Sequence, residues 1–366
     1  MVSVPGNPRA RPGLCLVVQR ICARPRGPPV NHNIIVLGAS AGGVGALRTL
    51  CGGLPADLPA ALFVVLHIPP GARSTLPEIL GRVGPLPASH PVEGELIQPG
   101  RIYVAPPDHH LLLDDRGERM LLRRGPQENR VRPAVDALFR SAAVSCGNRV
   151  IGVVLSGMLD DGSEGLVAIR RCGGRTVVQD PADAEWPDMP RNARERAEAE
   201  HCLPVAALPE LLRRLAQDPA PPPVPIPAEL LLEARISRQE ISAMSEDIIT
   251  VGRPSALGCP ECGGVLNEVG DAPWPRFRCQ IGHAYGARTL VAHQAESLEK
   301  ALGIAFRTQR DRRNLYLSME RAARQRNLAQ EAERWRKAAE EAQHFAELIG
   351  TAVDDLQRSG LPPVEA

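Results

Sequence analysis

From Asn33 onwards, short uninterrupted apolar runs alternate with segments that carry apolar residues at helical spacing. The apolar runs are IIVLG at 34–38, ALFVVLH at 61–67, VIGVVLSG at 150–157 and RTVVQD at 175–180. Continuous runs of Val, Ile and Leu are typical of parallel strands that are buried on both faces. The alternation of such strands with helices therefore predicts an α/β fold with a doubly wound, mainly parallel sheet.

Two segments interrupt this alternation. Between Ser89 and Arg124, the pieces RIYVAP, HLLLD and RMLLR predict a β-hairpin insertion at one edge of the sheet. The run DPAPPPVPIP at 218–227 is rich in proline, which forms an extended, semi-rigid spacer and indicates a domain boundary. We therefore expect a disordered extension at 1–31, an α/β domain at 32–216, a linker with a short helix at 217–257, a Cys/His module at 258–286 and a helical hairpin at 287–366.

Composition narrows the class of protein. The chain has 366 residues, 43% of them hydrophobic, which is enough for a substantial core divided among two or three domains. A formal net charge of +1 gives no electrostatic reason to expect nucleic acid or an anionic membrane as the main partner. No apolar run approaches the roughly 20 residues of a membrane-spanning helix, and the cysteine pattern is not a disulfide framework. We therefore expect a cytoplasmic protein.

The loop after the first predicted strand carries a hydroxyl group among small residues. GASAG, residues 38–42, matches the G-x-S-x-G pattern, in which Ser40 stands on a sharp turn from a strand into a helix. The helix N-terminus that follows offers free N–H groups to an oxyanion. A nucleotide site is the alternative, but the glycines do not have the spacing of a dinucleotide fingerprint and no G-K-[ST] sequence follows.

Two further strand ends carry catalytic residue types. His67 ends the second apolar run, and Asp160 and Asp161 follow the run at 150–157. The carboxyl ends of parallel strands gather at one edge of a sheet, so a serine, a histidine and a carboxylate there form a candidate triad. The alternatives are a structural histidine at a strand end and an aspartate that makes a turn or caps the next helix.

These motifs together resemble the catalytic domain of CheB-type chemotaxis protein-glutamate methylesterases over about Asn33 to Leu215. The matching segments are IIVLGASAGG, VVLHIPP, IYVAPPDHHLLL, VRPAVDALF, VIGVVLSGMLDDGSEG and MPRNA, in that order. The resemblance implies that Ser40 is the nucleophile, His67 the base and Asp161 the group that orients the base. It also implies that Ala41, Gly42 and Met158 lie near the oxyanion or substrate, Met158 through its backbone N–H.

The resemblance implies a reaction and a partner. The reaction is hydrolysis of glutamate γ-methyl esters on chemoreceptor helices with release of methanol and, in some members, deamidation of receptor glutamines. Two alternatives stay open: the same triad acting on a signalling protein outside chemotaxis, and a scaffold that has lost turnover. Ala41 stands where the family often has threonine, and the short stretch before Ile34 leaves no room for a receiver domain. We therefore expect no control by aspartyl phosphate. Because the implied reaction runs on the triad, we also expect no catalytic cofactor.

Three cysteines and a histidine form a metal-ligand pattern near the linker. Cys259 and Cys262 make C-x2-C, and Cys279 and His283 make C-x3-H after a gap of sixteen residues. Such spacing is typical of tetrahedral Zn²⁺ sites, and a closed set of four ligands predicts a structural zinc rather than a zinc hydrolase.

The C-terminal segment carries heptad-like apolar spacing. The expected seam in the last helix consists of Ala332, Trp335, Ala339, Ala342, Ala346, Ile349, Val353 and Leu356. The preceding helix shows two sevenfold series, Val291, Leu298, Ala305 and Ala295, Leu302, and a bend is expected near Asn327. An internal helix pair is the simplest interpretation; a homodimer through these helices, or docking to a receptor's helical bundle, is the alternative.

Overall fold

A computed structural model of the chain describes residues 31–240, 252–269 and 275–359. The predicted disordered extension therefore lies, apart from Asn31, outside the described residues. The chain divides into two compact units, residues 1–247 and 248–366, and each is described by itself. Among the described residues, no helix has both the length and the apolar character needed to cross a bilayer.

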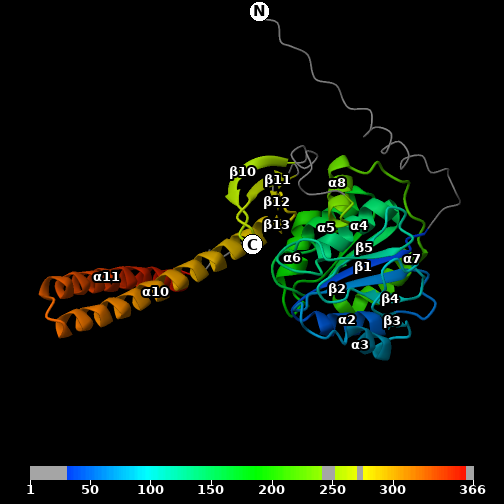
Figure 1. Cartoon of the computed structure of the whole chain (residues 1–366). Helices are drawn as coiled ribbons and strands as arrows, with labels where there is room; N and C mark the ends of the chain where they lie inside the picture. The colour runs from blue at the N-terminus through cyan, green and yellow to red at the C-terminus, as the bar shows by residue number, and fades with distance from the viewer. Residues whose placement is uncertain (1–30, 241–251, 270–274, 360–366) are drawn as a thin grey trace, which may run out of the picture. The chain divides into compact units, whose positions relative to one another are not determined.

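The first unit is built on a parallel sheet of seven strands in the order β3-β4-β2-β1-β7-β8-β9 (Figure 1). Every neighbouring pair in it runs parallel. The strands are β1 (Ile34–Ala39), β2 (Ala61–Leu66), β3 (Ala88–Ser89), β4 (Ile102–Val104), β7 (Val150–Val154), β8 (Arg175–Gln179) and β9 (His201–Leu203). The predicted α/β fold is confirmed, and β1, β2 and β7 are neighbours at its centre.

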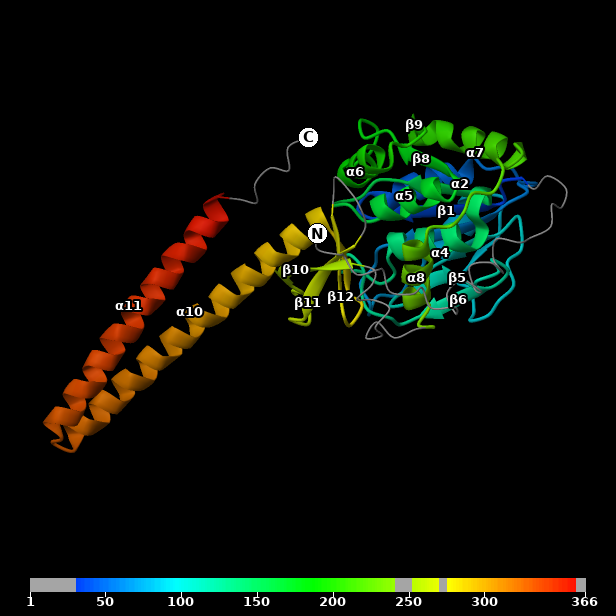
Figure 2. The same cartoon turned by 90° about the horizontal axis from the view of Figure 1, so that it is seen from above.

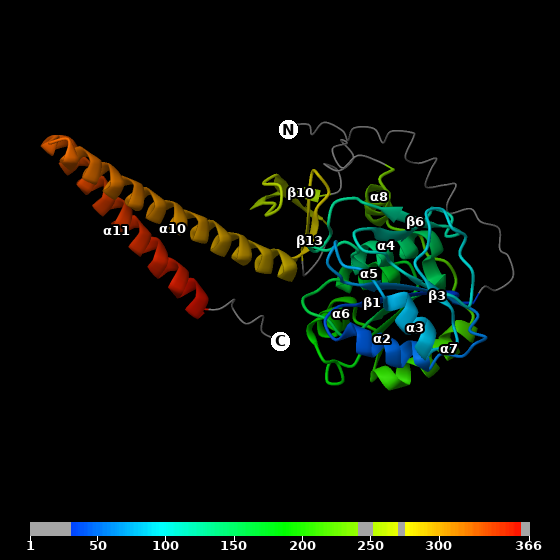
Figure 3. The same ribbon diagram turned by 60° about the horizontal axis from the view of Figure 1, so that its bottom comes forward.

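Helices cover both faces of this sheet, as Figures 1 and 3 show. One face packs against α2 (Gly43–Gly52), α3 (Leu76–Val83) and α7 (Leu208–Gln217). The other packs against α4 (Val135–Cys146), α5 (Ser163–Arg171), α6 (Asp188–Ala197) and α8 (Ala228–Ser237). Short 3₁₀ turns lie at Gly147–Arg149 and Val205–Ala207. Successive residues of β1 alternate between the two cores, because side chains of a strand point to opposite faces.

The edge of the sheet differs in part from the prediction. β5 (His110–Leu113) and β6 (Met120–Arg123) form the expected two-stranded hairpin. The segment RIYVAP, expected in the same insertion, instead supplies β4, which pairs in parallel with β2 and β3 in the main sheet. Three short apolar segments in a row cannot by themselves show which of them pairs with a distant strand.

The short helix predicted after the proline-rich segment is α8. It belongs to the first unit, where Leu230 and Ala234 are buried in the core beside α4. Residues 241–251 of the predicted linker lie outside the described residues.

The second unit begins with a four-stranded antiparallel sheet in the order β10-β11-β12-β13. Its strands are β10 (Gly252–Gly258), β11 (Val265–Val269), β12 (Arg276–Cys279) and β13 (Ala284–Gly286). Two long helices follow, α10 (Ala287–Gln325) and α11 (Ala329–Ser359), and they run side by side as an antiparallel hairpin (Figure 2). The bend is at Asn327, whose φ is 57°, so the predicted helical hairpin is confirmed.

Small buried side chains line the contact of the hairpin. Ala332, Ala339, Ala342 and Ala346 of α11 are buried, and the Trp335 ring stacks on Tyr316 of α10 with a centroid distance of 5.7 Å. In the series Val291, Leu298 and Ala305, the half-buried Ala305 fits the seam, but Val291 and Leu298 are wrong as part of it. These side chains are 47% and 48% exposed, whereas Ala295 and Leu302 are half-buried. An alanine-rich helix presents two similar sevenfold series, and only the partner helix decides which of them faces inward.

Candidate active site

Ser40 stands at the carboxyl end of β1, on the turn into α2. Its N–H donates to the Ser156 carbonyl at 2.9 Å, and its carbonyl accepts from the Gly43 N–H at 2.9 Å. Gly42 has φ 70°, and a Cβ on it would lie 2.7 Å from Ser156 Oγ and 2.9 Å from Glu185 Cβ. Glycine is therefore required at this position, both for the left-handed turn and for the close packing.

His67 follows β2 directly and faces two of the other predicted site residues. Its Nδ1 lies 3.1 Å from Ser40 Oγ, and its Nε2 lies 2.8 Å from Asp161 Oδ2. An ionised carboxylate only accepts hydrogen bonds, so Nε2 carries the ring proton and Nδ1 is free to accept from the serine hydroxyl. The three side chains thus form one continuous chain of hydrogen bonds across the ends of β1, β2 and the loop after β7.

Asp161 is buried and strongly hydrogen-bonded. Besides His67, it accepts from the N–H groups of Val135 at 2.7 Å and Asp136 at 3.1 Å, at the N-terminus of α4, and from Asn129 Nδ2 at 2.8 Å. Burial by itself raises the pKa of this carboxyl, but the hydrogen bonds from His67, Asn129 and Val135 outweigh it and hold the pKa below the ordinary value. The group therefore stays a carboxylate next to the imidazole.

The neighbouring Asp160 occupies a different environment. Its carbonyl accepts from the Ser163 N–H at 3.1 Å and so closes the turn into α5. Of the two adjacent aspartates, Asp161 is the one that contacts His67.

Two polar residues beside Asp161 were not among the predicted site residues. Asp136 Oδ1 accepts from the N–H groups of Gly162 at 3.0 Å and Gly165 at 2.6 Å, which fixes the loop that carries Asp161. Asn129 donates to Asp136 Oδ2 at 2.7 Å as well as to Asp161. Asp136 lies in VRPAVDALF, one of the segments that carry the CheB resemblance, so the sequence contains a signal for it. Nothing in the local sequence distinguishes Asn129.

The predicted oxyanion-site residues lie around the Ser40 turn. Ala41 and Gly42 precede the first residue of α2, and Met158 follows Gly157, whose Cβ position would be 2.9 Å from Ser40 Cβ. Within residues 31–240, the backbone N–H groups of Ala41, Gly42 and Met158 donate to no other backbone carbonyl. The N–H groups of Ala41 and Gly42 lie at the N-terminus of α2, where backbone donors favour a negatively charged oxygen, and that of Met158 lies in the loop after β7.

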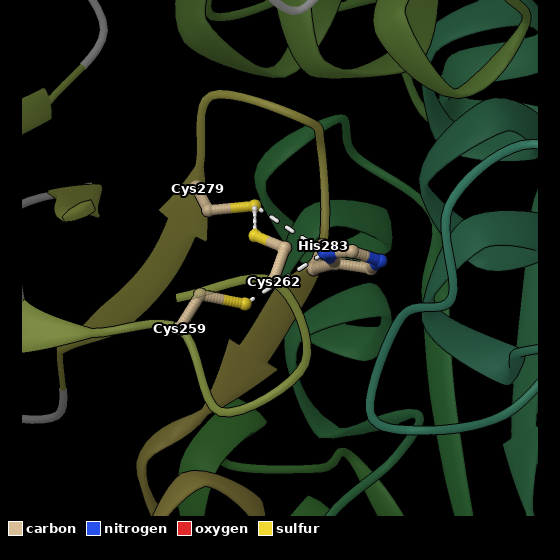
Figure 4. Close-up of side chains that lie close together, drawn as sticks. All are labelled: Cys259, Cys262, Cys279 and His283. Atoms are coloured by element: carbon tan, nitrogen blue, oxygen red, sulfur yellow. Dashed lines mark hydrogen bonds between the residues drawn. The ribbon is translucent and has the colours of Figure 1, made fainter. Parts of the chain in front are cut away.

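The Cys/His cluster lies at the ends of two tight turns in the second unit (Figure 4). Gly263 N–H donates to the Cys259 carbonyl at 2.8 Å, and Gly282 N–H donates to the Cys279 carbonyl at 3.0 Å. Gly263 and Gly282 have φ of 71° and 110°, which other residues rarely adopt. The turns direct Cys259, Cys262, Cys279 and His283 toward one another.

The donor atoms of this cluster are spaced as metal ligands. All four lie within 4.8 Å of one another, with Cys262 Sγ–Cys279 Sγ at 3.7 Å and Cys279 Sγ–His283 Nδ1 at 3.4 Å. A tetrahedral zinc with the usual bond lengths separates its ligand atoms by roughly 3.5–3.8 Å. His283 Nε2 lies 2.8 Å from the Glu261 carboxylate, which orients the ring so that Nδ1 faces the sulfurs. The cluster could therefore hold a metal ion.

Comparison with known proteins identifies the first unit. The family described as CheB methylesterase matches residues 35–212. A curated relative from Leptospira interrogans is 37% identical over 191 residues, which are 52% of this chain and 97% of the relative. The chain belongs to the CheB methylesterase family. The resemblance read from the motifs is confirmed, and its predicted extent of 33–215 agrees with the match.

Other CheB relatives are longer. The protein-glutamate methylesterase/protein-glutamine glutaminase 5 of Anaeromyxobacter dehalogenans is 38% identical over 221 residues, 58% of this chain and 61% of the relative. The crystal structure of the Thermotoga maritima CheB methylesterase catalytic domain is 34% identical and covers 51% of this chain and 100% of that domain, with a TM-score of 0.49. The chain spans about half to three fifths of the length of several curated relatives it matches.

The CheB match includes every element that carries Ser40, His67 and Asp161. It ends at residue 212, inside α7. Helix α8 and the Cys/His cluster lie beyond it. What these parts contribute must therefore be argued from their own contacts.

Proposed function

We propose that this chain is a serine hydrolase that removes methyl groups from glutamate γ-methyl esters. The observation that carries the proposal is the hydrogen-bond chain from Ser40 through His67 to Asp161, at the carboxyl ends of adjacent strands. Curated relatives of the family are named protein-glutamate methylesterase/protein-glutamine glutaminase, which supports both the reaction and the substrate class.

In the first half of the reaction Ser40 acts as the nucleophile. His67 Nδ1 takes the hydroxyl proton while Oγ bonds to the ester carbon, and the carbonyl oxygen becomes an oxyanion. Backbone N–H groups of Ala41, Gly42 and Met158 are the donors proposed for this oxyanion. Collapse breaks the bond to the methoxy group, which leaves as methanol with the proton from His67, and a glutamyl ester on Ser40 remains.

The second half reverses these roles with water. His67 takes a proton from a water molecule, whose oxygen attacks the glutamyl ester, and the proton returns to Ser40 Oγ as the free glutamate leaves. A glutamine substrate follows the same route, with ammonia leaving in place of methanol. The Asp161 carboxylate holds the His67 tautomer and stabilises the imidazolium that forms in each half.

For the second unit we propose a structural zinc held by Cys259, Cys262, Cys279 and His283. The zinc would supply no reaction chemistry; it would cross-link two turns in a module that has few buried side chains. A catalytic zinc requires a coordination position left open for water, whereas four protein donors fill a tetrahedral site. Elemental analysis should find about one zinc per chain, lost in a Cys259→Ser, Cys262→Ser variant.

Methylated chemoreceptors are the proposed substrate, and the cytoplasm is the proposed compartment. None of the cysteines that the structure describes forms a disulfide bond, as suits a reducing environment. The exposed faces of the α10–α11 hairpin offer a surface for contact with a receptor's helical bundle or for a homodimer.

The proposal is tested by incubating the full chain with receptor carrying labelled methyl esters and measuring released methanol. Ser40→Ala should lower the rate by several orders of magnitude, because it removes the nucleophile. Ser318→Ala, a serine on α10, is the matched control and should keep the wild-type rate. Near-wild-type release by Ser40→Ala would refute the serine assignment. No release by the wild type, with Ser40 still reactive toward an organophosphorus probe, would instead favour a substrate outside chemotaxis.

A further inference from the structure

The turn at Glu128–Val131 lies beside the proposed catalytic carboxylate and has an uncommon backbone. Asn129 and Arg130 have φ of 50° and 68°, two consecutive left-handed residues, neither of them glycine. Glu128 and Val131 close the turn by exchanging backbone hydrogen bonds of 3.3 and 3.1 Å. A run of two such residues needs support from the structure around it, so the contacts of this turn are informative.

On one side the turn contacts the candidate triad. The Asn129 amide group donates both of its hydrogens, to Asp161 Oδ1 at 2.8 Å and to Asp136 Oδ2 at 2.7 Å. Asn129 is buried, and Asp161 accepts from His67 with its other oxygen. The amide therefore fixes the rotation of the carboxylate that orients the imidazole.

On the other side the turn contacts α8 through Glu128. Arg140 Nη2 lies 2.6 and 2.5 Å from the two Glu128 carboxylate oxygens, and Ser237 Oγ donates to Glu128 Oε1 at 2.9 Å. Glu233 Oε2 lies 3.6 Å from Arg140 Nη1, and all four side chains are buried. A buried charged cluster holds its members in fixed positions, because moving one leaves another charge uncompensated.

We propose that Asn129 is a positioning residue for Asp161 and that α8 holds the Asn129 turn in place through Ser237 and Glu233. This inference rests on the proposed function, since it assumes that Asp161 serves the Ser40 reaction. Ser237 and Glu233 lie beyond residues 35–212, which match the family model, so the helix after the proline-rich segment is assigned a role in the geometry of the site. Burial of Leu230 and Ala234 explains why α8 packs on α4, but it does not explain the buried polar contacts with the turn.

The test measures the second-order rate at which a fluorophosphonate probe labels Ser40 in the full chain. This rate needs no receptor substrate. In Asn129→Ala the probe should label Ser40 roughly 100-fold more slowly, because the Asp161 carboxylate loses a hydrogen-bond donor that orients it. Ser237→Ala should label roughly tenfold more slowly. Ser237→Thr keeps the hydroxyl and should restore the rate to within twofold of wild type.

A control and a double variant separate positioning from general destabilisation. Glu229→Gln, on the same helix, removes a partly exposed pair with Arg171 and should label within twofold of wild type. Ser237→Ala should cause no further slowing in an Asn129→Ala background, because α8 acts on Asp161 through Asn129. Circular dichroism should show the folded state in every variant.

The outcomes distinguish this inference from the proposed function. Suppose that the wild type is labelled at Ser40. If Ser237→Ala is then labelled at the wild-type rate, or if the double variant is slowed by the product of the two single effects, the role of α8 is refuted and the esterase proposal stands. If the wild type is not labelled at Ser40, both fall.

Discussion

In the first unit, Ser40, His67 and Asp161 stand on a parallel sheet with an extensive apolar core on each face. In the second unit, the four Cys/His donors lie on turns of a small sheet whose buried apolar cluster contains only Cys259, Leu266, Phe277, Cys279, Tyr285 and Leu290 among the described residues. Two of those six residues are themselves metal-ligand candidates. The fold of the first unit thus holds its site in place. In the second unit, the candidate ligands are themselves a large part of the buried cluster that holds the fold.

This contrast predicts different effects of substitutions in the two units. Loss of a polar group in the first unit should impair chemistry while the sheet persists, since the apolar core does not depend on it. Loss of the ligand set in the second unit should impair folding of the module while leaving the chemistry of the first.

Metal removal should give the largest effect. Treatment with a chelator, or Cys259→Ser with Cys262→Ser, should unfold the module, because binding of a structural zinc supplies roughly 10 kcal/mol or more of folding free energy. Limited proteolysis should then cut within residues 252–286, and the rate of Ser40 labelling should stay within twofold of wild type. Cys202→Ser, a half-buried cysteine outside the cluster, is the control and should leave protease resistance unchanged. If the metal-free module resisted the protease equally well, its fold would not depend on the ligands and the contrast between the two units would be wrong.

Asp161→Asn should give the next largest effect, and its largest part should be on chemistry. The amide group that replaces the carboxylate donates to His67 Nε2, so the ring proton moves to Nδ1, which can then no longer accept the proton of Ser40. We expect the esterase rate to fall roughly 10⁴-fold with the fold intact. Asp160→Asn makes the same change at the neighbouring aspartate; it is the matched control and should retain activity within a few-fold, because Asp161 is the carboxylate that pairs with His67.

The two sites also differ in how far the sequence could define them. Ser40 and His67 each follow an apolar strand directly, so their meeting at the sheet edge could be predicted from parallel topology alone. The clustering of the four candidate ligands could be predicted from spacing, because the turns that bring them together are local. Asn129 could not, since it reaches Asp161 across 32 positions through a turn of left-handed residues that no local pattern specifies.

The errors in the fold have the same origin. In sequence, the segment at 101–106 resembles the neighbouring hairpin strands, yet its partner β2 lies some forty residues earlier in the chain. The spacing of Leu298 fits a helix seam, but its side chain lies on the exposed side of the hairpin. In each case the deciding contact is distant in sequence.

Acid should weaken the first unit through Asp161. Its pKa in the folded chain is lowered, so its carboxylate stabilises the fold above the ordinary pKa of about 3.8, and this contribution is lost as the pH falls through the folded value. The free energy of unfolding of the first unit, measured with urea between pH 6 and 3, should therefore depend less steeply on pH in Asp161→Asn. The difference in slope should correspond to the uptake of up to about one proton on unfolding. The same slope in both proteins would contradict the assignment of the lowered pKa to this group.

The smallest effect should come from the hairpin, where packing without polar contacts can be tested. Ala342 is buried between α11 and α10, so Ala342→Leu forces extra volume into a close contact and should destabilise the second unit by about 1–3 kcal/mol. Leu348→Ala changes an exposed side chain of the same helix and should shift stability by about 0.5 kcal/mol or less. Thermal unfolding followed by the helical signal measures both, and Ser40 labelling should not change in either. If Leu348→Ala proved the more damaging, the exposed face of α11 would be in contact with something in solution, and a concentration-dependent unfolding temperature would then indicate a second copy of this chain.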